Sequence, residues 1–278
     1  MQYYNLNYLE KSDLDGLMNN ENNYKKYIAK KIINQNSKTT DGWLIPNKLL
    51  PVDRGENKNK LIIANIIKKK RVVVKISKRK ELLEKDFITS NTLTKCVNFA
   101  KYLGFFTNDI NRPLPKYFCK NNGTENYFLF MKYYDLGSIL NYIPKSLNEI
   151  ISIINQVIAS ATLAFEQFGF IHGDLHPGNI LIKKTKKDLI KYKFTDKDLE
   201  IKINGIQIVM FDFDRSNFSA NFAMFFSELS AFINFYEMYL IEKNIFNKNN
   251  KLVTPFSQLK KEFHKIINIT QLKEFIGN

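Results

Sequence analysis

The residues best suited to chemistry lie in one short stretch, Phe170–Ile182, where a polar loop separates two apolar runs. The loop carries the carboxylate of Asp174 and the amide of Asn179, with a proline and a glycine between them. These two residues exclude a regular helix, so a loop can turn both side chains toward one point. Further along, an apolar run ends at Asp212. A carboxylate base, an amide and a second carboxylate at a strand end are what Mg²⁺-dependent phosphoryl transfer requires.

The chain that must position these residues has an ordinary globular composition. With 278 residues, 44% hydrophobic and 25% charged, it can bury a substantial core in one large domain or two lobes. Cys96 and Cys119 have no metal-ligand spacing and imply no disulfide framework, so we expect an intracellular protein, cytoplasmic or nuclear. The N-terminus lacks the apolar run of a secretory signal. The best membrane candidate, Ala220–Ile241, contains two glutamates, which favours a buried helix and predicts no transmembrane segment.

The net charge of +15 favours acidic partners, such as nucleic acid, nucleotides, phosphoproteins or anionic lipid. The basic residues are scattered and no nucleic-acid motif is present, so direct nucleic-acid binding is not favoured over a generally basic surface. A protein substrate that is itself acidic or associated with nucleic acid fits the charge. The high usage of Lys, Asn and Ile suggests an AT-rich coding sequence, as in some large DNA viruses and intracellular parasites. A viral protein would lie in the virion or the host cytoplasm.

The N-terminal half of the chain predicts a small β-rich part preceded by an extension. Residues 1–40 are polar and rich in Asn, Lys and Tyr. Two β-rich runs, 61–67 and 71–76, are joined by three lysines and predict a hairpin. Lys75 lies near the end of the second run. Apolar residues at helical spacing predict one long helix or two shorter ones over 80–103.

The middle of the chain contains the strongest helix. An apolar strand over 126–134 precedes it. The helix covers 146–168, where Ser146 and Glu149 make a capping box and Gly169 ends it. This helix leads directly into the polar loop.

Beyond the loop, the sequence predicts a hairpin and further helices. Asn204-Gly205 is a strong hairpin turn, with strand material at 199–203 on one side and 206–211 on the other. Helical runs follow at 218–245 and 256–275.

The order of these features resembles the protein-kinase-like fold over roughly residues 41–245. The series is a strand lysine, a helical glutamate, an extended strand and linker, a long helix, an HxDxxxxN loop, a hairpin and a strand-end aspartate. The resemblance implies an α+β, bilobal fold with a small β-rich N-terminal lobe and a mostly helical C-terminal lobe. We expect an extension at 1–40, the first lobe at 41–134, and the second at 135–278 with a hairpin inserted at 183–211.

The resemblance assigns a set of residues to ATP. Lys75 would hold the α- and β-phosphates and pair with Glu84. Met131 would lie at the back of the adenine pocket, and the residues after it would form the hinge that reads the adenine edge. In place of a GxGxxG loop, the segment expected to cover the phosphates has Gly55 alone. The expected ATP set is Lys75, Glu84, Gly55, Met131, Tyr133, Tyr134 and Asp212.

The resemblance also assigns the catalytic and metal residues. Asp174 would orient or deprotonate the acceptor hydroxyl, Lys75 would contribute through the phosphates, and His172 would brace the loop from behind. Asn179 and Asp212 would hold Mg²⁺, with Mn²⁺ as an alternative, because hard cations prefer oxygen ligands.

The chain departs from the kinase pattern at three places. Gly173 replaces the usual arginine after His172, the DFG motif reads Asp212-Phe213-Asp214, and no APE motif follows. The departures imply constitutive activity, or control by a partner, in place of control by activation-loop phosphorylation.

Two subfamilies fit the motifs. The HGDLHPGN loop resembles that of aminoglycoside and choline-type small-molecule phosphotransferases. The strand, the Lys-Lys-Thr and the hairpin that follow resemble haspin, an atypical serine/threonine protein kinase. About 65 residues follow Asp214, which is short for a small-molecule acceptor site. We therefore favour an ATP-dependent kinase that acts on Ser or Thr hydroxyls of a protein, with a small-molecule phosphotransferase and a pseudokinase scaffold as alternatives.

Overall fold

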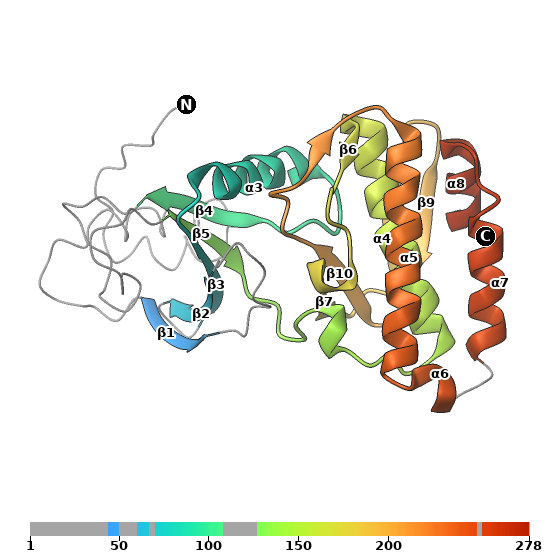
Figure 1. Cartoon of the computed structure of the whole chain (residues 1–278), viewed down its shortest axis with the longest axis horizontal. Coiled ribbons are helices and arrows are strands. Elements are labelled where there is room, and N and C mark those ends of the chain that lie inside the picture. The colour runs from blue at the N-terminus through green and yellow to red at the C-terminus, as the bar shows by residue number, and fades with distance from the viewer. Residues whose placement is uncertain (1–43, 50–59, 67–69, 108–126, 249–251, 278) are drawn as a thin grey trace, which may run out of the picture. The chain divides into compact units, whose positions relative to one another are not determined.

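The computed structural model describes residues 44–49, 60–66, 70–107, 127–248 and 252–277 (Figure 1). The chain divides into two compact units of mixed helix and strand. The first unit comprises the described parts of 1–88 together with 101–133, and the second comprises 89–100 and the described parts of 134–278. The expected extension at 1–40 lies outside the described residues.

The first unit contains a five-stranded antiparallel sheet in the order β1-β2-β3-β5-β4. Its strands are β1 (Leu44–Leu49), β2 (Lys60–Ile66), β3 (Lys70–Ser77), β4 (Tyr102–Thr107) and β5 (Tyr127–Lys132). The pairing of β2 with β3 confirms the predicted hairpin. Apolar side chains of β3 and β5 are buried on both faces of the sheet, so these two strands form the core of the unit.

The predicted helix over 80–103 is wrong beyond Thr92. Helix α3 (Lys80–Thr92) is followed by a 3-10 turn, η1 (Leu93–Lys95), and then by Asn98 in the left-handed region with φ 67°. The backbone then pairs with Met210, whose N–H donates to Asn98 O at 2.7 Å and whose O accepts from Ala100 N–H at 2.8 Å. These long-range bonds outweigh the helical spacing of the apolar residues.

The core helix of the second unit is α4 (Leu147–Phe168). The Ser146 side chain accepts a hydrogen bond from Glu149 N–H, and Gly169 ends the helix at φ 66°, so both predicted caps are confirmed. The second bond of the predicted capping box differs, because the Glu149 carboxylate accepts from Lys145 N–H at 2.8 Å in place of Ser146 N–H.

Within the described part of the chain, one helix, α4, is long and apolar enough to cross a membrane. Of its most apolar window, 72% is buried inside the structure. Gln156 is buried in its middle, donating to Ile206 O and accepting from Ile208 N–H of a neighbouring strand. Buried polar groups that are satisfied by neighbouring backbone are the mark of a core helix.

The second unit also contains three two-stranded antiparallel pairs. Their pairing differs from the hairpin that the sequence predicts around Asn204-Gly205. The strands are β6 (Phe170–Ile171), β7 (Ile180–Lys184), β8 (Leu189–Lys193), β9 (Asp198–Lys202), β10 (Ile206–Met210) and β11 (Asn217–Phe218). The Asn204-Gly205 turn forms as predicted, with positive φ at both residues and a bond from Ile206 N–H to Ile203 O. Its flanking strands do not pair with each other, because β9 pairs back to β8 while β10 pairs with β7.

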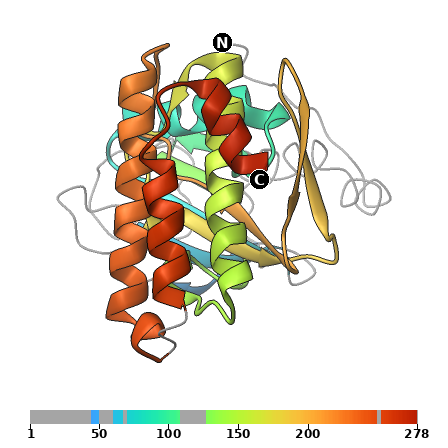
Figure 2. The same ribbon diagram turned by 90° about the vertical axis from the view of Figure 1, so that its right-hand side faces the viewer.

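The remaining helices are α5 (Phe222–Glu242), α6 (Ile245–Lys248), α7 (Val253–Phe263) and α8 (Ile269–Gly277) (Figure 2). The helical segment expected at 256–275 is divided between α7 and α8. Lys273 of α8 is buried and bonds to Glu166 of α4 and to Asp196 in the β8–β9 turn. This ion-pair cluster fixes the β8–β9 hairpin against α4 and α8.

Candidate active site

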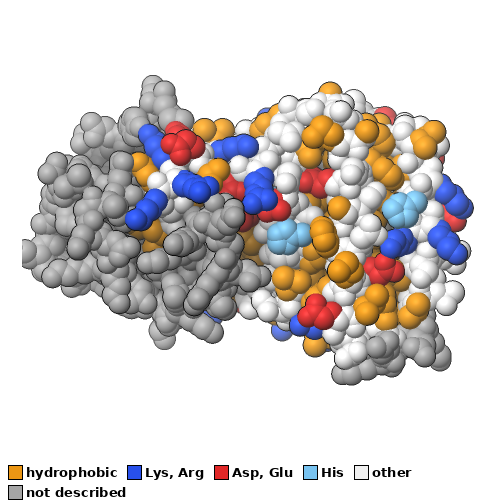
Figure 3. Space-filling model, viewed as in Figure 1, with side chains coloured by type: hydrophobic (Ala, Val, Ile, Leu, Met, Phe, Trp, Pro, Cys, Tyr) orange, Lys and Arg blue, Asp and Glu red, His pale blue; other side chains and the backbone are white. Residues whose placement is uncertain are grey.

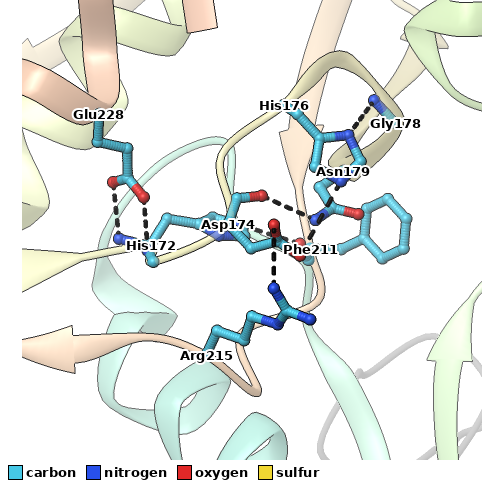
Figure 4. Close-up of polar contacts among 9 residues, drawn as sticks. His172, Asp174, His176, Gly178, Asn179, Phe211, Arg215 and Glu228 are labelled. Carbon is cyan, nitrogen blue, oxygen red and sulfur yellow. Dashed lines mark hydrogen bonds and ion pairs between the residues drawn. The ribbon is translucent and has the colours of Figure 1, made fainter. Parts of the chain in front are cut away.

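One backbone segment holds the polar loop to the end of β10. The His172 ring donates from Nε2 to Phe211 O at 3.0 Å, and Phe211 N–H donates to Asn179 O at 3.1 Å (Figure 4). Because Asp212 follows Phe211 directly, these two hydrogen bonds bring the residue at the strand end close to both ends of the loop.

A side-chain bond closes the loop across its own width. Asn179 is buried, and its Nδ2 donates to the backbone O of Asp174 at 2.9 Å. Asp174 and Asn179 thus lie close together, and the bond joins the Asn179 side chain to the Asp174 backbone. Among the described residues, no hydrogen bond reaches Asn179 Oδ1, so this amide oxygen is of the kind that hard cations accept as a ligand.

The Asp174 carboxylate is oriented by two loose polar contacts. Arg215 Nη1 lies 3.8 Å from Oδ1, and His176 Nε2 lies 4.0 Å from Oδ2, with the Asp174 side chain 34% exposed. Both distances exceed a hydrogen bond, so the carboxylate keeps its capacity to accept a proton. His176 Nδ1 accepts from Gly178 N–H at 3.0 Å, which places the proton of the neutral ring on Nε2, facing Asp174.

Glu228 anchors the start of the loop from helix α5. Its two carboxylate oxygens accept from His172 N–H at 3.0 Å and from Gly173 N–H at 2.5 Å (Figure 4). Burial raises the pKa of Glu228, while the backbone amides oppose the shift. The sequence reasoning missed this residue. Its one signal was a glutamate within a largely apolar helix.

The conformation of Gly173 explains why the usual arginine is absent. Its φ is +77°, and a Cβ at this position would lie 2.3 Å from Arg215 O and 2.8 Å from Arg215 C. A backbone in the left-handed region strains any other residue, and a side chain would also collide with main-chain atoms. The loop therefore requires glycine here.

Asp212 stands in a strained conformation at the end of β10. Its φ is 69°, and the other non-glycine residues with positive φ in the described part of the chain are asparagines. Phe213 beyond it is fully buried, with its ring 5.5 Å from that of His172 and 6.1 Å from that of Phe170. The positive φ of Asp212 is a strained backbone conformation that the buried Phe213 holds in place. Backbone strain of this kind is common at functional sites.

In the first unit, the partner of Lys75 differs from the predicted one. Lys75 Nζ lies 3.1 Å from Asp86 Oδ2, and the Asp86 side chain is fully buried. The predicted pairing with Glu84 is corrected to Asp86. Leu83 and Asp86 stand three residues apart on the buried face of α3, whereas Glu84 is turned about 200° from Asp86 around the helix.

The remaining predicted ATP residues are distributed between the units. Met131 is buried in β5, and Tyr133 lies 5.3 Å from the Arg71 guanidinium in the first unit. Tyr134 begins the longer segment of the second unit, where its O accepts from Gly137 N–H. Gly55 lies outside the described residues. The roles of these residues in ATP binding stay predictions.

The carboxylate and amide oxygens of Asp212 and Asn179 are chemically suited to hold Mg²⁺. No group of three or more His, Cys, Asp and Glu side chains suited to a metal occurs within the described ranges. Mg²⁺ does not need one, because it is commonly held by one or two protein oxygens together with substrate phosphates. Asp212 and the Oδ1 of Asn179 would supply two such oxygens, and their role as metal ligands stays a prediction.

Part of the chain is similar to kinase-like transferases. The matching proteins include haspin serine/threonine-protein kinases, at 34% identity over 80 residues for Mus musculus and 32% over 77 for Drosophila melanogaster. These matches cover 29% and 28% of this chain but 11% and 14% of those kinases. An uncharacterised Caenorhabditis elegans protein is 27% identical over 121 residues, which is 44% of this chain and 40% of that protein. No family model matches the chain.

The buried imidazole of His172 predicts a pH dependence of stability. Burial lowers its pKa from 6.5, although the Phe211 carbonyl and the carboxylates of Asp212 and Asp174 oppose the shift. Between the lowered value and 6.5 the unfolded chain binds more protons than the folded one, so stability falls as the pH drops below 6.5. In His172→Gln, the amide can still donate to Phe211 O but does not titrate.

Denaturant unfolding at a series of pH values measures this difference. Between pH 6.5 and the lowered pKa, wild type should lose up to about 1.4 kcal/mol per pH unit more than His172→Gln. His264→Gln removes an exposed histidine and should keep the wild-type slope. Equal slopes for wild type and His172→Gln would contradict the assignment of His172 as a buried neutral base.

Substitution of Glu228 tests its anchoring role. In Glu228→Gln, one carboxylate oxygen becomes an NH₂ group that faces a backbone N–H, so a donor loses its acceptor. We expect about 1–3 kcal/mol lower stability and a roughly tenfold lower transfer rate through displacement of Asp174. The measurements are urea unfolding and the transfer assay described below. Glu200→Gln, the same change at an exposed residue of β9 outside the loop, is the control, and an equal effect in both variants would argue against the anchor.

Proposed function

We propose that the chain is an ATP- and Mg²⁺-dependent protein kinase that transfers the γ-phosphoryl group to Ser or Thr hydroxyls. The observation that carries the proposal is the pair of hydrogen bonds between the Phe211 backbone and the loop. Phe211 O accepts from the His172 ring, and Phe211 N–H donates to Asn179 O. The pair gathers a base, an amide and a second carboxylate, the set that phosphoryl transfer uses.

Each residue has a role in the proposed reaction. Asp174 accepts the proton of the acceptor hydroxyl, and His172 holds the loop to β10. Asn179 Oδ1 and Asp212 hold the cation, which supplies charge neutralisation at the phosphates when bound. Lys75, oriented by the buried Asp86, binds the α- and β-phosphates.

A protein acceptor is favoured over a small molecule by the relatives. The haspin proteins that match part of the chain are named as serine/threonine-protein kinases. We extend that activity, and an intracellular location, to this chain as part of the proposal. Because Gly173 leaves no arginine beside His172, the proposed kinase is active without activation-loop phosphorylation.

Transfer from γ-labelled ATP tests the proposal directly. The full chain is offered casein, histone and protamine-like proteins beside aminoglycosides and choline, with Mg²⁺ or Mn²⁺ and with EDTA as the metal-free control. We expect label on protein Ser or Thr, lost with EDTA and unchanged by phosphatase pretreatment of the enzyme. Label on a small molecule alone would favour a small-molecule phosphotransferase over a protein kinase. The absence of transfer to any acceptor would favour a pseudokinase scaffold.

A further inference from the structure

A groove of about 1060 Å³ in the second unit leads away from the catalytic loop. One wall is formed by the loop around Asp174 and by Arg215. The other wall is one face of α5, with Met224, Ser227, Glu228, Ala231, Phe235 and Met238. Figure 3 shows orange apolar side chains gathered on the face of the molecule over α5.

The α5 wall is an apolar helix face that no part of the described chain covers. α5 carries apolar residues on every side, and helices of this kind are normally buried all round. Yet Met224, Phe235 and Met238 are 51%, 50% and 64% exposed. Their spacing of three and four residues through Glu228 and Ala231 aligns them along one stripe of the helix. The stripe has the character of a contact surface.

Two features select an acceptor polypeptide as the occupant. The groove is continuous with Asp174, so a chain whose hydroxyl reaches this carboxylate must continue along the groove. Its ionisable lining is Asp174, Glu228 and Glu242 against Arg215 and a histidine. Carboxylates outnumber cations there, although the whole chain has a net charge of +15, so the groove disfavours acidic segments.

The helix sets the distance between the phosphorylated residue and an apolar anchor. Glu228 bonds to Gly173, the neighbour of Asp174. Phe235 lies seven residues further along α5, and Met238 lies ten, which is about 10 and 15 Å at 1.5 Å per residue. An extended chain covers these distances in about three to five residues.

We propose that the acceptor is a non-acidic polypeptide with an aliphatic or aromatic residue about three to five positions from the phosphorylated Ser or Thr, bound by Phe235 and Met238. This inference rests on the proposed kinase activity for the location of the hydroxyl. It specifies a sequence preference that a small-molecule acceptor would not have. Burial of one large apolar side chain should lower KM at least about tenfold.

A peptide scan tests the preference. Each peptide has one Thr in a Gly/Gln background, and a single Leu or Phe is moved through the six positions on either side. We expect KM to fall at least about tenfold when the anchor is three to five residues from Thr on one side. Phe235→Ser and Met238→Ser should remove this optimum, whereas Ile267→Ser, a 75% exposed apolar residue elsewhere, should retain it. A flat profile, or an optimum that survives both substitutions, would overturn the inference.

Direct binding separates the inference from the proposed activity. The same peptides with Ala in place of Thr are labelled, and their binding to the full chain is followed by fluorescence anisotropy. An anchor-dependent affinity lost in Phe235→Ser, in a chain that transfers no phosphate, would support the groove and refute the kinase. Phosphate transfer with an affinity that does not depend on the anchor would support the kinase activity and refute the groove. The absence of both binding and transfer would refute the groove and the kinase activity.

Discussion

Replacement of Asp174 with asparagine should reduce phosphoryl transfer by about 10²–10⁴-fold, the usual contribution of a positioned base. The substitution removes the proton acceptor and keeps the side-chain shape. It should leave the loop in place, because Asn179 bonds to the backbone O of Asp174 and not to its carboxylate. Stability should also change little, since the contacts of the carboxylate with Arg215 and His176 are long and partly exposed.

Rates of label transfer and urea unfolding of the same preparations check this expectation. Asp198→Asn makes the same chemical change on the exposed β8–β9 hairpin and should transfer at the wild-type rate. The loss of the base should leave at most about a hundredth of the wild-type rate. If Asp174→Asn kept more than about a tenth of that rate, another group would be the base.

Gly173→Ala should be the most damaging single-methyl change in the loop. The left-handed backbone costs a non-glycine residue about 1–2 kcal/mol, and the new Cβ would lie 2.3 Å from Arg215 O, so main chain must move. The movement strains the bonds from Glu228 or shifts the turn after Asp212. Either outcome displaces Asp174, and a displacement of about 1 Å can lower the rate about 10²-fold.

Gly205→Ala is a matched control for this prediction. Gly205 has φ +76°, close to that of Gly173, but a Cβ there meets no atom within 4 Å. The control should therefore lose about 1–2 kcal/mol through the backbone alone and keep its activity. If the two variants behaved alike in unfolding and transfer, the close approach to Arg215 would have no consequence.

The sequence predicted those parts of the fold that depend on neighbouring residues. The caps of α4 at Ser146 and Gly169 follow from local hydrogen bonding and backbone freedom. The closure of the loop between Asp174 and Asn179 follows from the residues between them. The hairpin of β2 and β3 likewise depends on a short connection.

The sequence failed where distant segments choose between equivalent partners. Glu84 and Asp86 are both acidic residues early in α3, and the face that packs inward decides which one meets Lys75. Glu228 lies 55 residues from Gly173, too far for any local pattern to connect them. The strands around Asn204-Gly205 carry a strong local turn, yet each finds its partner elsewhere.

The β7–β10 ladder also bears on how this protein can change its length over evolution. Met210 pairs with Ile180, so the ladder ends beside Asn179 and Phe211, while the chain between its opposite ends forms the β8–β9 hairpin. A residue inserted within β7 or β10 would shift the pairing and turn the following side chains to the other face. Insertions in the hairpin lie beyond the far end of the ladder and leave the Met210–Ile180 register unchanged. The length of the connections to the hairpin can therefore vary without a shift at the end of the ladder that lies beside Asn179 and Phe211.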